Sequence, residues 1–189
     1  MRIIAGKLKG HSLNMSKDKN TRPLKDMARE SVFNLLKHSN KISLEFEKIN
    51  ILDLYAGTGS FGLECLSRKA KLAYFVENNK CALDSLKKNI EKLNLKKKTM
   101  IFFDDVFNVI KDSAILDLKF DLIFCDPPFK NKNIGKLIEL IFNKNLLKSN
   151  GIIILHRNKA MEDKTPHYFK VIDQRIYGVS KIIFAKFLS

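Results

Sequence analysis

The stretch "LDLYAGTGSFG", residues 52–62, runs from an apolar segment through a glycine-rich loop into a helical pattern. Its glycines, Gly57, Gly59 and Gly62, follow the spacing GxGxxG. Glycines let a ligand approach the backbone closely, and the first turn of the following helix offers unpaired N–H groups. The stretch therefore predicts a strand, a ligand-binding loop and a helix, the opening unit of a doubly wound α/β sheet.

The same alternation continues along the chain. Further apolar runs are "LAYFVE", "TMIFF", "FDLIFC" and "GIIILH", and helical patterns fall near residues 59–69, 80–93 and 133–147. Such alternation predicts a largely parallel sheet flanked by helices. The last two runs, "FKVIDQRIYG" and "SKIIFAKFL", leave no room for a crossover helix between them, so we expect an antiparallel hairpin at the sheet edge. The expected sheet has seven strands in all.

The N-terminal part has a different pattern. The segment "RIIAGKLKGHSL" (residues 2–13) mixes short apolar pieces with glycines and predicts a small hairpin. The segment "LKDMARESVFNLL" (residues 24–36) has helical periodicity and follows Pro23, a residue suited to a helix entrance. We therefore expect residues 1–48 to form a hairpin and helix extension, and residues 49–189 to form the ligand-binding domain.

The charge and the composition limit the kinds of partner that the chain can have. The chain of 189 residues carries 35 Lys and Arg against 20 Asp and Glu, a net charge of +15. Such a charge attracts polyanions, although a lysine-rich coding bias would also produce it. Three scattered cysteines without CxxC spacing predict neither a disulfide framework nor a zinc site, and fit a reducing cytoplasm. No apolar run approaches the roughly 18 residues of a membrane span, and the first ten residues lack the apolar stretch of an export signal.

Acidic residues at the strand ends indicate which ligand the glycine loop takes. Asp53 lies just before the loop, where its charge would oppose the pyrophosphate of a dinucleotide. S-adenosylmethionine instead has a cationic ammonium and no phosphate. Glu77 ends the next strand, where an acid can accept hydrogen bonds from ribose hydroxyls, as it also does for NAD. In "FFDDV", Asp105 could accept from the adenine amine, or Asp104 or Asp105 could cap a helix.

A second motif, "CDPPF" (residues 125–129), directly follows the apolar run "FDLIF". The fourth strand of a doubly wound sheet ends beside the first, so Asp126 is expected to point toward the bound cofactor. Pro127 lacks an N–H and restricts Asp126, and Phe129 becomes a ring on a stiff mount. An ordinary turn is the alternative. An acceptor, a free carbonyl and a flat ring suit a planar base with an exocyclic amine, held out of its stack.

Together these motifs resemble a known family. The stretches concerned are "RIIAGKLKG", "TRP", "ARESVFNLL", "DLYAGTGSFGLECLSRKA", "FVEN", "DPPF" and the final "YG" at residues 177–178. They resemble the bacterial 16S ribosomal RNA guanine-N2 methyltransferases, the RsmD-like enzymes with the class I S-adenosylmethionine-dependent fold. The resemblance covers nearly the whole chain and implies methyl transfer from S-adenosylmethionine to the N2 amine of a guanine in 16S rRNA, either as naked RNA or in an assembling small ribosomal subunit.

The resemblance also implies site residues. The base would be held by Asp126, Pro127, Pro128 and Phe129, and RNA would be contacted by Arg22 and Arg29. Apart from the resemblance, we expect Lys7 and Lys9 to join these two arginines in a phosphate-binding surface beside the site. The cofactor would be bound by Asp53, Ala56, Gly57, Thr58, Gly59, Glu77, Asn78, Asp105 and Val106. No metal is required, and a monomer is favoured. The chain departs from the family at "LHRNK", where an acidic residue often ends the fifth strand, which leaves the roles of His156 and Arg157 open.

Three alternatives stay open at this point. Motifs like DPPF also serve enzymes that methylate adenine N6 or cytosine N4 in DNA or RNA. A non-catalytic RNA-binding protein of ribosome assembly would keep the fold and the basic surface. A nicotinamide oxidoreductase would use the glycine loop, but Asp53 and the lack of a separate substrate domain disfavour it.

Overall fold

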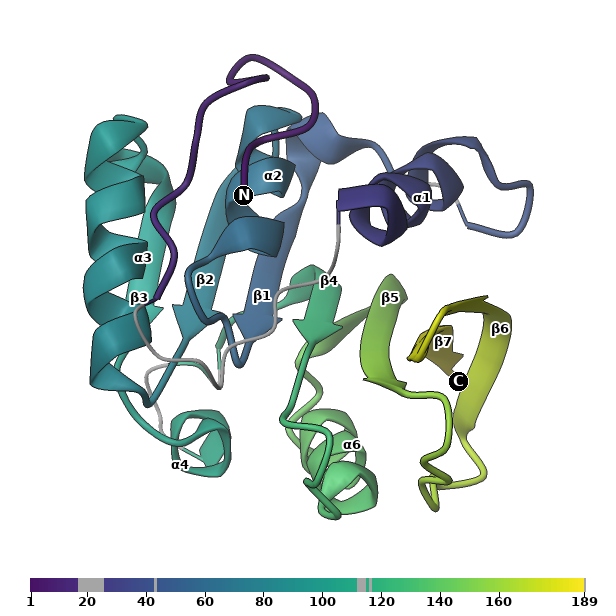
Figure 1. Ribbon diagram of the computed structural model, residues 1–189. Coiled ribbons are helices and arrows are strands. Elements are labelled where there is room, and N and C mark those ends of the chain that lie inside the picture. Colours follow the sequence, from purple (N-terminus) through teal and green to yellow (C-terminus); the bar gives the residue numbers. More distant parts are fainter. Residues whose placement is uncertain (17–25, 43, 112–114, 116, 189) are drawn as a thin grey trace.

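The computed structural model describes residues 1–16, 26–42, 44–111, 115 and 117–188 (Figure 1). Among these residues the strands form one seven-stranded sheet in the order β3-β2-β1-β4-β5-β7-β6. Its strands are β1 (Asn50–Leu54), β2 (Leu72–Val76), β3 (Thr99–Phe102), β4 (Phe120–Cys125), β5 (Leu147–Asn158), β6 (Phe169–Tyr177) and β7 (Ser180–Phe187). Strands β1 to β5 pair in parallel, and β7 runs antiparallel to β5 and β6. The predicted parallel sheet with an antiparallel hairpin is confirmed.

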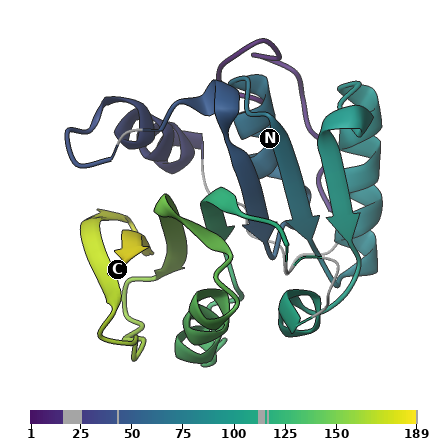
Figure 2. The same cartoon turned by 180° about the vertical axis from the view of Figure 1, so that it is seen from behind.

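Helices cover both faces of the sheet (Figures 1 and 2). They are α1 (Asp26–His38), α2 (Ser60–Ser67), α3 (Lys80–Lys92), α4 (Val106–Lys111) and α6 (Ile134–Asn143), with short 3-10 turns η1 (Phe46–Lys48) and η2 (Lys96–Lys98). One core layer joins α1, α2 and α3 to the sheet, and the other joins α4 and α6 to it. Strand β1 contributes Ile51 to the first layer and Leu52 and Leu54 to the second. Burial on both faces is the reason why the strands read as continuous apolar runs.

The N-terminal segment packs on this sheet domain through a shared core. Residues 1–13 fold back on themselves, with an antiparallel bridge between Arg2 and Ser12. Ile3 and Leu13 of this hairpin are buried in the same core layer as Ile51. The Glu64 carboxylate of α2 fixes the hairpin, because it accepts hydrogen bonds from the N–H groups of Ile4 at 2.7 Å and Ala5 at 2.9 Å.

Helix α1 docks on the same layer through aromatic rings. Phe33 of α1 stacks on Phe61 of α2 with ring centroids 5.1 Å apart, and Phe61 stacks on Phe124 of β4 at 3.8 Å. The Arg68 guanidinium lies over the Phe33 ring, 4.3 Å from its centroid. Such contacts add to the free energy of burial and fix the orientation of the helix. The hairpin of residues 1–13 and helix α1 are therefore positioned by the sheet domain.

Two further expectations concern cysteines and membrane spans. Cys65, Cys81 and Cys125 are free thiols, and Cys65 and Cys125 are buried. In the described ranges, no helix has both the length and the apolar character that crossing a membrane would require.

Candidate active site

The carboxyl ends of four parallel strands lie at one edge of the sheet. In the pairing register Leu54 of β1 lies opposite both Val76 of β2 and Cys125 of β4, and Val76 lies opposite Phe102 of β3. The four loops that follow these residues therefore start at the same level. Strand order also reverses beside β1, because β2 lies on one side and β4 on the other. Ligands of open α/β sheets bind at such a switch point.

The glycine loop has the backbone that its sequence predicts. Gly57 and Gly59 adopt positive φ angles of 57° and 80°. A Cβ atom on Gly59 would lie 2.3 Å from a methyl group of Leu86, so the close approach of α3 also requires glycine there. Ala56, Thr58 and both glycines are buried. The loop at the start of α2 therefore consists mostly of main-chain atoms, which a ligand can approach closely.

The two strand-end acids brace this loop. Glu77 accepts hydrogen bonds from Gly57 N at 2.6 Å through Oε2 and from Asn79 N at 2.7 Å through Oε1. Asp53 is almost fully buried and accepts from Gly62 N at 3.0 Å. Burial raises the pKa of Asp53 well above its ordinary value, and the nearby charges of Asp126 and Glu77 raise it further. Sequence reasoning assigned both acids to the ligand alone and missed this bracing role.

The remaining predicted cofactor residues lie around the ends of β2 and β3. Asn78 is exposed and Val106 is buried. Asp105 caps α4, because its Oδ1 accepts from Phe107 N at 2.9 Å, so the capping alternative is confirmed for Asp105. Asp104 is exposed, and hydrogen bonds from Asn108 and the Asp105 N–H lower its pKa. An adenine contact of Asp105 stays a prediction.

The DPPF segment is anchored beside the glycine loop. The Asp126 N–H donates to Leu54 O of β1 at 3.3 Å, and the side chain of Asp126 is 21% exposed. Pro127 is buried, Pro128 is exposed and Phe129 is half-buried. Asn131 closes the turn through its N–H to Pro128 O at 2.8 Å. An acidic side chain and an aromatic ring therefore reach the strand ends on a stiff backbone.

Two residues at the end of β5, His156 and Arg157, form contacts with the DPPF segment and its turn. His156 Nδ1 lies 2.7 Å from Asp126 Oδ1. Arg157, fully buried, donates to Asn131 O at 2.7 Å and more weakly to Pro128 O at 3.4 Å. Its guanidinium also forms a two-point pair with Asp163, with both distances 2.8 Å. Sequence reasoning left both roles open. The available signal was a pair of polar residues closing the apolar run "GIIIL".

The four residues expected to contact RNA differ in their exposure. Lys7 and Lys9 are exposed on the N-terminal hairpin. Arg22 lies outside the described residues. Arg29 is fully buried, so its expected place on an exposed phosphate-binding surface is wrong.

The burial of Arg29 follows from the helical pattern of α1. Arg29 lies on the face formed by Ala28, Val32 and Phe33, which is the face turned to the core. Its guanidinium donates to Arg2 O at 2.5 Å and to Asp26 Oδ1 at 3.0 Å. Burial is the main cause of the lowered pKa of Arg29. The side chain therefore joins the hairpin to α1.

A buried amide on α3 also contributes to the site. Asn89 donates to Thr58 O of the glycine loop at 3.0 Å and to Asn14 O of the N-terminal segment at 3.1 Å. Its Oδ1 accepts from Asn14 N at 2.7 Å. One side chain thus connects the glycine loop to the segment that follows the hairpin.

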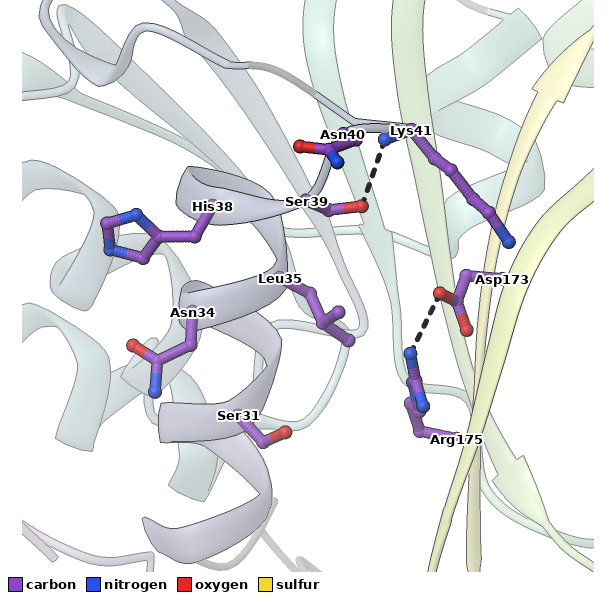
Figure 3. A pocket seen from close by; sticks show the side chains of 9 residues that line it. All are labelled: Ser31, Asn34, Leu35, His38, Ser39, Asn40, Lys41, Asp173 and Arg175. Carbon is purple, nitrogen blue, oxygen red and sulfur yellow. Dashed lines mark hydrogen bonds and ion pairs between the residues drawn. The ribbon is translucent and has the colours of Figure 1, made fainter.

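A groove between α1 and β6 is separate from this site (Figure 3). Its lining residues are Ser31, Asn34, Leu35, His38, Ser39, Asn40, Lys41, Asp173 and Arg175. Arg175 pairs with Asp173, two residues before it on β6, at 3.1 Å. None of the predicted cofactor or base residues lines the groove, so it takes no part in the site at the strand ends.

The fold agrees with comparisons to known proteins. The family model described as "Conserved hypothetical protein 95" matches residues 1–186. The chain belongs to this family. The "Ribosomal RNA small subunit methyltransferase D" of Haemophilus influenzae is 31% identical to it over 186 residues, which cover 95% of this chain and 90% of the relative. The protein of the same name from Escherichia coli is 32% identical over 151 residues, covering 80% and 68% of the two chains.

Solved structures add the fold. The Escherichia coli protein yhhF superposes with a TM-score of 0.82 at 24% identity, covering 99% of this chain and 97% of that one. SMU.776, solved as a complex with SAH, superposes with a TM-score of 0.62 at 19% identity, covering 83% and 48%. SAH is S-adenosylhomocysteine, the product left when S-adenosylmethionine gives up its methyl group. This member of the Conserved hypothetical protein 95 family has the fold of the class I S-adenosylmethionine-dependent methyltransferases.

The strand ends of this family member fit that cofactor electrostatically. Asp53, Glu77 and Asp126 are close enough for the charges of the other two to raise the pKa of Asp53. Such a cluster of carboxylates repels phosphate and attracts a cation. S-adenosylmethionine carries two cationic groups, an ammonium and a sulfonium. The same cluster opposes a dinucleotide, which weakens the oxidoreductase alternative.

Proposed function

We propose that this protein transfers the methyl group of S-adenosylmethionine to the exocyclic N2 amine of a guanine in 16S rRNA, as naked RNA or within an assembling small subunit. The observation that carries the proposal is the contact between the DPPF segment and the end of β1, where Asp126 N donates to Leu54 O at 3.3 Å. The relatives named as small-subunit rRNA methyltransferases support ribosomal RNA as the substrate.

Three residues of the DPPF segment, Asp126, Pro127 and Phe129, would have a role in the transfer. The cofactor, when bound, supplies an electrophilic methyl group on its sulfonium. The lone pair of a guanine N2 is delocalised into the base, so the protein must act mainly by holding N2 in line with that methyl group. Asp126 and the Pro127 carbonyl would accept the two N2 hydrogens, and Asp126 would take the proton that N2 loses. Phe129 would stack on the flipped base.

The test of this proposal is transfer of labelled methyl to 16S RNA and to small subunits from a strain that lacks the modification. Nucleoside analysis should place the label in N2-methylguanosine. Label in N6-methyladenosine or N4-methylcytidine, or in DNA, would replace the guanine with one of the alternative amines. Measurable cofactor binding without any transfer to RNA or DNA would instead favour a role in ribosome assembly.

Cofactor binding is expected to release protons. The raised pKa of Asp53 means that the folded, unliganded protein retains a proton on this group above its ordinary pKa of 3.8. A bound ammonium favours the carboxylate, so binding lowers this pKa and the proton leaves. Affinity should therefore rise with pH until Asp53 is ionised in the free protein.

Titration calorimetry in two mildly acidic buffers of different ionisation enthalpy measures this release. Asp53→Asn should bind more weakly and release no proton. Asp84→Asn changes an exposed acid on α3 and serves as the matched control. Equal proton release in wild type and Asp53→Asn would contradict a role of Asp53 at the ammonium.

Lys7 and Lys9 are expected to contact RNA phosphates. Changing either to glutamate should weaken RNA binding by roughly three- to tenfold and reduce the salt slope of log affinity by about 1, because each phosphate contact releases counterions. Affinities measured by filter binding between about 50 and 200 mM salt give this slope. Lys170→Glu, on the β6 edge, is the control. An unchanged slope in the Lys7 and Lys9 variants would place the RNA elsewhere.

A further inference from the structure

Asp126 is the first member of a hydrogen-bonded chain that crosses three strands. His156 of β5 lies with Nδ1 2.7 Å from Asp126 Oδ1 and Nε2 2.8 Å from Ser180 Oγ of β7. The imidazole is only 3% exposed. The same ring meets Phe129 edge to face, with centroids 5.5 Å apart and an angle of 81°. One buried side chain therefore contacts both the acidic and the aromatic member of the DPPF segment.

Hydrogen-bond chemistry assigns the direction of this chain. An ionised carboxylate has no hydrogen and can only accept, so Nδ1 of His156 must be the donor to Asp126. In the neutral ring Nε2 then accepts from the Ser180 hydroxyl. Because Oδ1 of Asp126 already accepts from this donor, Oδ2 keeps the greater capacity to accept from a substrate amine.

This contact matters because a carboxylate is free to turn about its last bond. The terminal torsion of aspartate is broad and nearly twofold, so the stiff backbone at Pro127 alone does not select an orientation. The His156 donor is itself held by contacts to Ser180 and to the Phe129 ring, so it selects one orientation of the carboxylate. Transfer rates depend steeply on such orientation, with losses of about a hundredfold for small displacements.

We propose that His156 is a positioning residue for methyl transfer, which sets the rotation of the Asp126 carboxylate and the tilt of the Phe129 ring through Nδ1 and the ring edge. The inference rests on the proposed function, in which Asp126 accepts a hydrogen of the substrate amine. Ser180 in turn holds the imidazole from the side away from Asp126.

The order of carboxylate, imidazole and hydroxyl is also that of hydrolase triads, but its direction here is reversed. In a triad the hydroxyl reacts and the carboxylate is buried behind the imidazole. In this chain the carboxylate of Asp126 lies at the switch point of the sheet, next to the glycine loop, and Ser180 is the remote member. The geometry thus assigns the histidine to the support of an acceptor.

Kinetics of three variants test the proposal. His156→Ala should lower kcat roughly 10- to 100-fold while the KM for S-adenosylmethionine stays within about twofold, because the cofactor loop is untouched. His156→Asn should recover most of kcat, since its Nδ2 can occupy the place of Nδ1. Ser180→Ala should cost about threefold, because it removes only the outer contact. His167→Ala, an exposed histidine, is the matched control.

A readout without substrate separates this inference from the proposed function. Nitrogen-15 NMR of the imidazole in the cofactor-free protein should show His156 protonated at Nδ1 and hydrogen bonded. A wild type that methylates no RNA would refute the proposed function. The positioning role is overturned separately, by an unchanged kcat in His156→Ala, by no recovery in a folded His156→Asn, or by a ring protonated at Nε2 alone.

Discussion

Replacing Asp126 with alanine is expected to abolish methyl transfer, with a loss in kcat of about a thousandfold. That loss corresponds to roughly 4 kcal/mol of transition-state stabilisation. The substitution removes the acceptor for the N2 hydrogens and for the departing proton, and it leaves the His156 imidazole without its carboxylate partner. Cofactor affinity should change by no more than about threefold, because the loop contacts of Asp53 and Glu77 remain.

Single-turnover methyl transfer measures the loss of rate, and calorimetry measures the cofactor affinity. Both are measured on the same preparations, so that the two effects can be separated. Asp126→Asn keeps the shape of the side chain but loses its charge, and should recover only a small part of the rate. Asp84→Ala, on the exposed side of α3, should behave like the wild type in both assays. Substantial turnover by Asp126→Ala would rule out the assigned role, and a parallel loss of cofactor binding would show that the substitution disturbs the cofactor site as well.

The second large effect is expected at Gly6, in the N-terminal hairpin. Gly6 has a φ angle of +86°, and a Cβ atom there would lie 2.0 Å from the backbone oxygen of Ser67 in α2. That oxygen already accepts from Lys7 N at 2.8 Å, so neither backbone can move without losing this hydrogen bond. Gly6→Ala should therefore lower the free energy of unfolding by roughly 3 kcal/mol through strain and overpacking together.

Gly10 offers an internal control for this prediction. Its φ angle is +88°, nearly that of Gly6, but a Cβ atom there would meet nothing within 4 Å. Gly10→Ala should cost only the conformational strain, about 1 kcal/mol. Urea unfolding of both variants gives the comparison. Equal losses would mean that the contact with Ser67 contributes nothing, and that the hairpin is held by Glu64 and its buried apolar residues.

The local pattern of the sequence was enough to predict the order of the elements. Strands β1 to β5 and helices α2, α3 and α6 were each signalled by their own periodicity, and the C-terminal hairpin by the missing crossover between two strands. Helix α4 was anticipated only through a possible N-cap at Asp104 or Asp105, because six residues are too few for a helical pattern. The positions of the glycine loop, Asp53, Glu77 and Asp126 followed from the rule that parallel strands end at one edge.

The burial of Arg29 could not be predicted from the local sequence pattern. Its charge predicts an exposed side chain, while its spacing from Val32 and Phe33 predicts the core face, and the packing of α1 decided for the core. The hairpin carbonyl of Arg2 then supplied an acceptor from 27 residues away.

What the sequence by itself determined is the set of elements and the ligand-facing edge, since both depend on the repeat of apolar residues and on residues at strand ends. Tertiary structure alone decided the supports of the site: Asn89 reaches 75 residues back to Asn14, and His156 reaches 30 residues back to Asp126. The physical reason is that hydrogen bonding is short-ranged in space and leaves no periodic trace along the chain, so only folding brings donor and acceptor together.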